Sequence, residues 1–294
     1  MEIKKEFPHI NFLEKEPMSR HTTFRIGGPA GLFASVQVAD VAPLVSYCQT
    51  HDIPVTILGN GSNVLVGDQG IEGLVLSFGK EASAITIEDD QIRAEAGALL
   101  SQVANAALEH GLGGLAFAAG IPGTIGGAVC MNAGAYGGEM KDVVETVTCL
   151  TPEGTVETRP ADALAFGYRT SVFEQDGSCV LSATLRLARG DKAAIRARMA
   201  ELLAKRREKQ PLEWPSAGST FKRPQGAFAA ALIEQCGLKG LQVGGAAVSQ
   251  KHSGFVVNLG GATCADVIAL TEQVIRVVKE KTGYTLEREI RVVK

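Results

Sequence analysis

Two loops rich in glycine and asparagine have the residue types that bind an anion through backbone N–H groups. The first, GNGSN, lies between two apolar runs and consists of Gly59, Asn60, Gly61, Ser62 and Asn63. The second, AGIPGTIGGA, covers residues 119–128 and includes Ile121, Pro122, Gly123 and Thr124. Successive N–H groups in such loops can face a diphosphate without any cationic side chain. A simple hairpin turn is the alternative for each loop, but two of them in one half of the chain favour a nucleotide site.

Further polar segments could act on an anionic substrate. Tyr168 and Arg169 stand among small and apolar residues in FGYRTSVF, and an arginine buried there would need an anionic partner. Ser219 lies in a turn of small residues, SAGST, followed by Lys222 and Arg223. The alternatives are a structural ion pair at Arg169 and a helix N-cap with surface cations at Ser219.

Charged residues alternate in the segment LEREIRVVK. Glu287, Glu289 and Arg291 are two positions apart, so a strand would place all three on one face. In isolation, the charged outer face of an edge strand is the favoured interpretation.

Several common catalytic motifs are absent from the sequence. There is no P-loop, H-E-x-x-H or G-x-S-x-G, and none of the six cysteines forms a C-x-x-C pair. The string G-x-G-x-x-A at residues 111–116 follows a predicted helix rather than a strand, so it lacks the context of a dinucleotide fingerprint. These absences argue against a serine hydrolase, a zinc site and a disulfide framework, and we expect no metal.

The composition fits an ordinary globular protein. The chain has 294 residues, 45% of them hydrophobic, which is enough for a substantial core and about two domains. A formal net charge of −3 gives no nucleic-acid footprint. No apolar run approaches the roughly 18 residues of a membrane span, and the first residues lack a signal-peptide core. We therefore expect no membrane insertion, and the scattered cysteines favour a reducing cytoplasm.

Hydrophobic periodicity and turn residues predict mixed helices and strands. A turn leading into a strand is expected over residues 22–38, and strands over 55–66 (interrupted by the GNGSN loop), 73–78, 84–89, 91–97, 179–189, 246–260 and 285–294, with a hairpin over 142–160. Helices are expected over 41–50 after an Asp40 cap, over 98–110 where apolar residues recur at helical spacing, over 191–210 after an Asp191 cap, and over 227–236. A last helix is expected over 263–281, opened by a Thr263 and Asp266 cap and closed by Gly283. The glycine-dense stretch 111–138 is either a tightly turned core loop or a ligand cradle.

Seven segments together resemble the UDP-N-acetylenolpyruvoylglucosamine reductase family of bacterial flavoenzymes. In order they are TTFRIGGPA, LGNGSNVLV, AGIPGTIGGAVCMNAGAYGGEM, FGYRTSVF, SAGSTFKRP, GLKGLQVGGAAVSQKHSGFVVN and LEREIR. The resemblance runs from about residue 22 to residue 291, and seven ordered motifs are far more specific than one.

The resemblance implies an α+β fold. Two subdomains would form an FAD-binding domain of the vanillyl-alcohol-oxidase (PCMH) type, followed by an α+β substrate-binding domain. The expected limits are 1–72 and 73–210 for the two FAD-binding subdomains and 211–294 for the C-terminal domain, with the last strand able to return to the FAD domain.

The same resemblance implies an activity. The enzyme would use NADPH and non-covalent FAD to reduce UDP-N-acetyl-enolpyruvoylglucosamine to UDP-N-acetylmuramate, a step of peptidoglycan synthesis and so of cell-wall biogenesis, cell shape and cell division. It would be cytoplasmic, with a monomer favoured. Another flavin oxidoreductase of the same fold and a non-catalytic nucleotide-sugar binder are the alternatives.

The family's motifs also imply roles for individual residues. Arg169 would polarise the substrate carboxylate, Glu289 would donate a hydrogen bond to it, and Ser219 would deliver a proton to C2. FAD would be held by Gly59 to Asn63 and by Ile121 to Thr124. The residues that match the family's substrate contacts are Tyr168, Lys222, Lys251 and Arg291.

The chain departs from the family's pattern in two places. It lacks the tyrosine-bearing loop that one branch of the family has ahead of the SAGST segment, and Arg223 stands where many members have Asn. The group that covers the substrate diphosphate is therefore left open.

Overall fold

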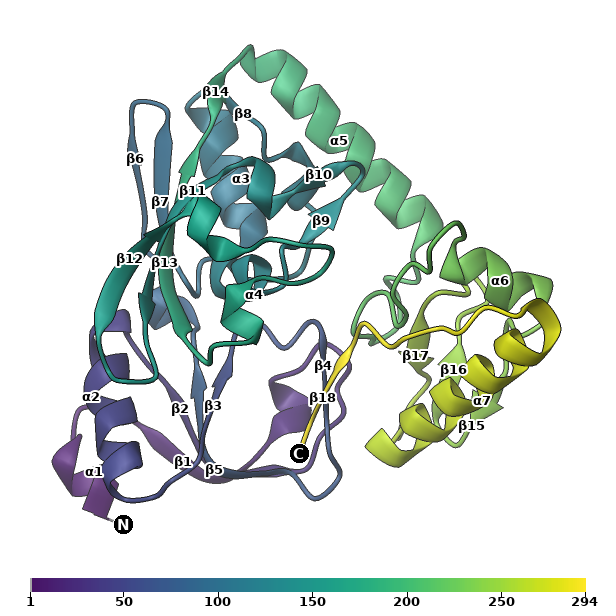
Figure 1. Cartoon of the computed structure of the whole chain (residues 1–294), viewed down its shortest axis with the longest axis horizontal. Helices are drawn as coiled ribbons and strands as arrows, with labels where there is room; N and C mark the ends of the chain where they lie inside the picture. The colour runs from purple at the N-terminus through teal and green to yellow at the C-terminus, as the bar shows by residue number, and fades with distance from the viewer. Residues whose placement is uncertain (1) are drawn as a thin grey trace. The chain divides into compact units, whose positions relative to one another are not determined.

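Figure 1 shows the computed structural model of the chain, in which residues 2–294 are described. Helices and strands are mixed along the sequence, as expected for an α+β protein. The chain forms two compact units built from interleaved segments. The first unit comprises Met1–Leu13, Leu32–Asn60 and Gly73–Arg206, and the second comprises Glu14–Gly31, Gly61–Glu72 and Arg207–Lys294.

One core of the first unit lies beside two helices, α1 (Glu2–Glu6) and α2 (Val38–Thr50). The sheet there has the order β1-β2-β5-β3, formed by β1 (Phe12–Pro17), β2 (Pro29–Ser35), β5 (Ile71–Ser77) and β3 (Val55–Leu58). Strands β3 and β5 run parallel. The core side chains include Leu32, Leu44, Cys48, Leu74 and Leu76.

Helix α2 begins earlier than expected. Val38 is its first residue and Gln37 precedes it, so the prediction that Asp40 is the N-cap was wrong. The carboxylate of Asp40 instead accepts a hydrogen bond from the backbone N–H of Gln37 at 3.3 Å, as the third residue of a capping box does.

The other core of the first unit lies on a five-stranded antiparallel sheet with the order β12-β11-β13-β7-β6. Its strands are β6 (Ile85–Glu88), β7 (Gln91–Glu95), β11 (Val144–Leu150), β12 (Val156–Pro160) and β13 (Cys179–Arg186). Helices α3 (Leu100–Glu109) and α4 (Ile125–Cys130) contact this sheet. Helix α3 buries Leu100, Val103, Ala104, Ala107 and Leu108, the helical spacing seen in the sequence.

Short elements complete the first unit. Two small ladders pair β8 (Leu112–Gly113) with β14 (Ala188–Arg189), and β9 (Gly134–Ala135) with β10 (Gly138–Glu139). Helix α5 (Lys192–Lys209) begins after Asp191, whose carboxylate accepts the N–H of Ala194 at 2.8 Å as expected for a cap. Single 3₁₀ turns occupy Met18–Arg20 (in the second unit), Lys80–Ala82, Ala116–Ala118, Met140–Asp142, Ala161–Leu164 and Val172–Glu174.

The second unit packs α6 (Ala229–Gln235) and α7 (Cys264–Thr282) around the sheet β15-β16-β17 (Figure 1). The strands are β15 (Gln242–Val243), β16 (Ala246–Val248) and β17 (Val256–Asn258). Thr263 caps α7 and Gly283 ends it at φ +79°, both as predicted. Helix α7 buries Val267, Leu270, Thr271, Val274 and Val278.

Two expected strands of this unit are shorter than predicted. Residues 246–260 form not one strand but β16 and β17, which are antiparallel and separated by a turn. Of residues 285–294, only Arg291–Val293 form a strand, β18, and it pairs in parallel with β4 (Val64–Val66). That pairing joins the last predicted strand to residues assigned by sequence to the first FAD-binding subdomain.

A carboxylate from a remote segment also holds the second unit together. Asp68 accepts hydrogen bonds from the backbone N–H groups of Cys264 and Ala265, at 2.7 and 3.0 Å. A negative charge is favourable at these first residues of α7, because the N–H groups of a helix start lack partners in the helix. The side chains of Phe24, Ile26 and Leu65 join the same core.

The two units and the three domains expected from the sequence are different divisions of the chain, so the domain limits 1–72, 73–210 and 211–294 stay a prediction. Within residues 2–294, no helix is both long enough and apolar enough to span a bilayer.

Candidate functional site

The start of the GNGSN loop and residues Ile121 to Thr124 lie together in the first unit. The side-chain amide of Asn60 donates to the carbonyl oxygen of Pro122 at 2.7 Å. A Cβ added to Gly59 would stand 2.5 Å from Oγ1 of Thr124, closer than real Cβ contacts. Only glycine therefore lets these two loops approach each other here.

The hydroxyl of Thr124 is buried without a hydrogen-bond partner among the described residues. A buried donor or acceptor without a partner lowers the stability of the fold by roughly 1–3 kcal/mol. Such a group therefore calls for an explanation, and a bound ligand is one. The same hydroxyl is the atom that a Cβ on Gly59 would meet, so the two loops lie against each other at this point. The close approach of Gly59 to Thr124 and the unpartnered hydroxyl are the two observations in the first unit that bear on a bound cofactor.

Part of the second loop is engaged in the protein itself. The backbone N–H of Ile121 donates to Ala118, that of Ile125 to Ala98 and that of Gly126 to Ala96, all at 2.8–3.0 Å. These three groups hold the loop and the start of α4 in place. A ligand would have to use other donors, such as the Thr124 hydroxyl.

The rest of the GNGSN loop, Gly61 to Asn63, belongs to the second unit. Gly61 has φ +59°, and a Cβ there would lie 2.2 Å from the carbonyl oxygen of His21. Asn63 donates its side-chain amide to the carbonyl oxygen of Glu289 at 3.1 Å, and its own carbonyl accepts the N–H of Arg291 at 2.9 Å. Asn63 thus lies directly beside Glu289, with Ser62 preceding it.

Arg169 sits in a tight turn of the first unit. Gly167 and Thr170 form an isolated β-bridge around it, and Arg169 adopts φ +57°, a left-handed conformation rare outside glycine. Its guanidinium donates to the carbonyl oxygen of Gly134 at 2.9 Å and lies 5.1 Å from the centroid of the Tyr168 ring. Tyr168 is 48% exposed, so neither residue is sealed in the core.

Two residues that the sequence did not single out support this turn. The amide of Asn132, which is fully buried, donates to the carbonyl of Gly167 and to the carboxylate of Glu139, each at 2.9 Å. The hydrogen bond from Lys141 is the main cause that lowers the pKa of Glu139, and the charge of Arg169 acts in the same direction. Glu139 is therefore an anion near the arginine. An acidic residue in the glycine-dense stretch GAYGGEM was the signal available in the sequence.

Ser219 and Glu289 come together in the second unit on neighbouring extended segments. Thr220 joins them, because its carbonyl accepts the N–H of Glu289 and its own N–H donates to Gly254, both at 2.8 Å. Isolated β-bridges pair Ser219 with Phe255 and Phe221 with Arg288. Ser219 is exposed and Glu289 is partly buried.

The four residues matched to substrate contacts occupy surface positions. Lys222 lies 3.4 Å from the carboxylate of Glu287, an exposed pair of the kind that contributes little to stability. Lys251 donates to the carbonyl oxygen of Arg207 at 2.7 Å. Arg291 is exposed in β18 of the second unit, whereas Tyr168 belongs to the first.

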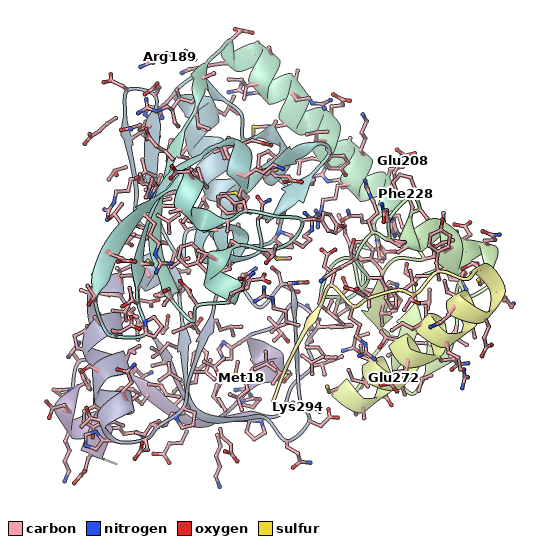
Figure 2. The ribbon with its side chains drawn as sticks, viewed as in Figure 1. Met18, Arg189, Glu208, Phe228, Glu272 and Lys294 are labelled. Atoms are coloured by element: carbon pink, nitrogen blue, oxygen red, sulfur yellow. The ribbon has the colours of Figure 1, made fainter. Side chains whose placement is uncertain are left out.

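An exposed aromatic ring follows the Ser219 segment. Phe228, labelled in Figure 2, is 61% exposed, and the Cζ atom of Arg223 lies 4.5 Å from the centroid of its ring. The same picture labels Glu272 on α7, whose carboxylate lies 3.4 Å from the guanidinium of Arg288, the neighbour of Glu289.

Metal and thiol chemistry would depend on the possible metal ligands and on the cysteines of the chain. Within residues 2–294, no group of three or more His, Cys, Asp or Glu could hold a metal ion, and the six cysteines are free. Burial raises the pKa of Cys179 to about 12 and that of Cys48 to about 11, so both are protonated, unreactive thiols near neutral pH.

Two family models match this chain. Residues 29–159 match an FAD binding domain, and residues 210–293 match the C-terminal domain of UDP-N-acetylenolpyruvoylglucosamine reductase. Together they cover the glycine loops, Ser219, Lys251 and Glu289, while Arg169 lies between the two matched ranges.

Two relatives and one solved structure share a name. The UDP-N-acetylenolpyruvoylglucosamine reductase of Agathobacter rectalis is 50% identical over 99% of this chain and 96% of its own length. That of Caldanaerobacter subterraneus subsp. tengcongensis is also 50% identical, over 95% of this chain and 92% of its own. The crystal structure of the Thermus caldophilus reductase (MurB) superimposes with a TM-score of 0.83 at 36% identity, covering 97% of this chain and 99% of that one.

Proposed function

This chain belongs to the UDP-N-acetylenolpyruvoylglucosamine reductase family, and we propose that it reduces UDP-N-acetyl-enolpyruvoylglucosamine to UDP-N-acetylmuramate for peptidoglycan synthesis. The reductant is NADPH and the cofactor is non-covalent FAD. The fold class expected from the sequence is confirmed in its main features: an α+β protein that combines an FAD-binding domain with the reductase C-terminal domain.

The observation that carries the cofactor assignment is the contact between Gly59 and Thr124. The close approach of the two loops and the buried, unpartnered hydroxyl suit a ligand bound chiefly by backbone and neutral polar groups. We assign FAD binding to Gly59 to Asn63 and Ile121 to Thr124. FAD bound there would supply the chemistry of hydride transfer between NADPH and the enolpyruvyl group.

The chemical step places particular demands on the protein. Hydride addition at C3 of the enolpyruvyl group leaves negative charge at C2, which spreads into the adjacent carboxylate. Fixed positive charge and hydrogen-bond donors directed at that carboxylate stabilise it, and a proton must then reach C2.

We assign the carboxylate to Arg169 and Glu289. A guanidinium has five N–H donors, so Arg169 can keep its bond to the Gly134 carbonyl and still offer others to a carboxylate. Glu289 can donate to that carboxylate only in its protonated form.

Ser219 is assigned as the proton donor to C2. A serine hydroxyl is a weak acid in water, but proton transfer to a carbanion-like carbon is favourable. Its exposure and its place on a β-bridge make the hydroxyl accessible on a fixed backbone. Tyr168, Lys222, Lys251 and Arg291 are proposed to contact the diphosphate and nucleotide end of the substrate.

The experiment that tests this function follows both half-reactions. The purified protein should show the absorbance of oxidised flavin. NADPH loss should accelerate when the enolpyruvyl sugar is added, with one NADPH consumed for each sugar molecule reduced. Equal NADPH loss without the sugar would favour another flavin oxidoreductase. A colourless protein that binds the sugar without consuming NADPH would favour a nucleotide-sugar binder.

Two further assignments belong to this proposal. The substrates are cytoplasmic metabolites in such a pathway, so we place the enzyme in the cytoplasm, and we expect a monomer. Light scattering coupled to gel filtration would test the second assignment, and a dimer mass would contradict it.

A further inference from the structure

A polar turn in the second unit connects two residues of the proposed site. Residues 249–255 join β16 to β17, and Lys251 lies within them. The same turn reaches the catalytic segment, because the carbonyl of Gly254 accepts the N–H of Thr220 at 2.8 Å and Phe255 forms the β-bridge with Ser219. The shape of this turn therefore fixes both the Lys251 backbone and the Ser219 backbone.

His252 is at the centre of the turn. Its Nδ1 atom lies 3.2 Å from the backbone nitrogen of Gly254, which can only donate. Nδ1 must therefore be the acceptor, which requires a neutral ring with its proton on Nε2. The ring packs edge-on against Phe255, with centroids 4.9 Å apart.

Buried serines hold the two sides of the turn. Ser249, 4% exposed, accepts the N–H groups of Lys251 and His252 at 3.1 and 3.2 Å. Ser253, 2% exposed, donates to the carbonyl of Ala230 in α6 at 2.7 Å. His252 is thus the titratable member of a network that is otherwise neutral.

We propose that His252 is a positioning residue, whose neutral ring fixes the 249–255 turn through Gly254 and so places Ser219 and Lys251 for the nucleotide-sugar substrate. This inference rests on the proposed function. A proton on Nδ1 would face the Gly254 N–H donor to donor, so protonation opens the turn. The turn is then a pH-sensitive support of the substrate side of the enzyme.

The charged groups that act on His252 are few. Burial is the largest cause that lowers its pKa; its own backbone carbonyl opposes this, Lys239 lowers the pKa further and Glu234 raises it. Lys239 and Glu234 are an ion pair at 2.7 Å, so their effects partly cancel. A lowered pKa means that the unfolded chain takes up a proton first, so the turn is fully stable above about pH 6.5 and loses stability as the pH falls below it.

The first measurement does not depend on turnover. In the FAD-loaded full chain, ¹⁵N NMR of the imidazoles should show His252 as the neutral Nε2–H tautomer at pH 7. Its pKa should lie below the ordinary value of histidine. A protonated ring, or the Nδ1–H tautomer, would overturn the proposal whether or not the protein proves to be a reductase.

The second measurement uses two variants of the same residue. His252→Leu removes the acceptor and should raise KM for the enolpyruvyl sugar about tenfold, the equivalent of one hydrogen bond, and speed hydrogen exchange of the Gly254 amide. His252→Asn should restore the parent KM and the parent exchange rate, because the side-chain oxygen of an Asn can accept the backbone N–H of the residue two positions later, here Gly254. Flavin reduction by NADPH should be unchanged in both variants.

The pH profile separates positioning from a purely structural role. In the parent enzyme KM for the sugar should rise as the pH falls well below 6.5, the ordinary pKa of histidine. His252→Asn cannot titrate and should lose that component. His110→Asn, at an exposed helix end of the first unit, serves as the control and should keep the parent's profile. An Asn variant that behaves like the Leu variant, or a parent profile retained in His252→Asn, would contradict the proposal.

Discussion

The arginine of the first unit and the serine and glutamate of the second are held by different means. Arg169 occupies a left-handed position in a four-residue turn, supported by the side chain of Asn132. Ser219 and Glu289 lie on extended backbone, joined through Thr220 by hydrogen bonds of the main chain. The turn depends on individual side chains, whereas the extended segments depend on backbone pairing that most side chains tolerate.

This difference predicts which substitutions will change only the chemistry of the site and which will also change its backbone geometry. In the second unit, changing Ser219 should alter chemistry and leave the backbone in place. In the first unit, Gly59 has no room for a side chain, so a small change there should alter geometry first. Three predictions follow this contrast from the largest expected effect to the smallest.

Ser219→Ala should produce the largest loss. Flavin reduction by NADPH should persist, while reoxidation by the enolpyruvyl sugar should fall by about 10²–10⁴-fold, the usual contribution of a general acid. Stopped-flow absorbance of the flavin measures the two half-reactions separately. Equal slowing of both would show that Ser219 supports structure rather than proton transfer.

Gly59→Ala should have an intermediate effect on the first unit. The new methyl group would meet the Thr124 hydroxyl at 2.5 Å, and such overpacking costs roughly 1–3 kcal/mol. Gly127→Ala is the matched comparison, because its methyl group would lie 3.8 Å from the same atom, an ordinary contact. FAD content after purification should fall much more in the first variant, and equal FAD content in the two would refute the close-approach argument.

Thr124→Val should have the smallest effect. It should stabilise the protein without FAD but weaken the binding of FAD. The apo protein should gain about 1 kcal/mol because a buried hydroxyl without a partner is removed. FAD affinity should weaken about tenfold because a hydrogen bond to the cofactor is lost. Urea unfolding of the apo protein and fluorescence titration with FAD measure the two, with Thr124→Ser as the control that keeps the hydroxyl. Lower stability together with unchanged affinity would contradict the assignment.

Local signals in the sequence predicted much of the fold. Thr263, Asp266 and Gly283 mark the ends of α7 because caps are local chemistry. The turn after β16 was not predicted, because apolar residues on both sides of SQKHSG are typical of one continuous strand. The hydrogen bonds to Ser249 that bend the chain there form only when the protein folds. The start of α2 was also missed. Asp40 is a good N-cap by residue type, but in the structure Gln37 is the cap and Asp40 is the third residue of the helix.

The site was less accessible to reasoning from the sequence than the fold. Residue types and spacing singled out the two glycine loops, Arg169, Ser219 and Glu289. The role of each residue came from a family resemblance and remains a proposal. Glu139 was marked only by being an acidic residue in a glycine-dense stretch, and Asn132 gave no pattern, because their importance arises from contacts with Lys141 and Gly167 that only the folded chain brings about. The unpartnered hydroxyl of Thr124 is likewise a property of packing rather than of residue type.

The contact between Asn63 and Glu289 joins residues 226 positions apart. On a ribosome adding about 5–20 residues per second, the Asn63 segment would wait roughly 10 to 45 seconds for its partner to be made. During that interval β4 is an unpaired strand edge, open to wrong pairings. We therefore expect nascent chains of this protein to need chaperone protection longest at the segment around β4, and the second unit to acquire its structure last.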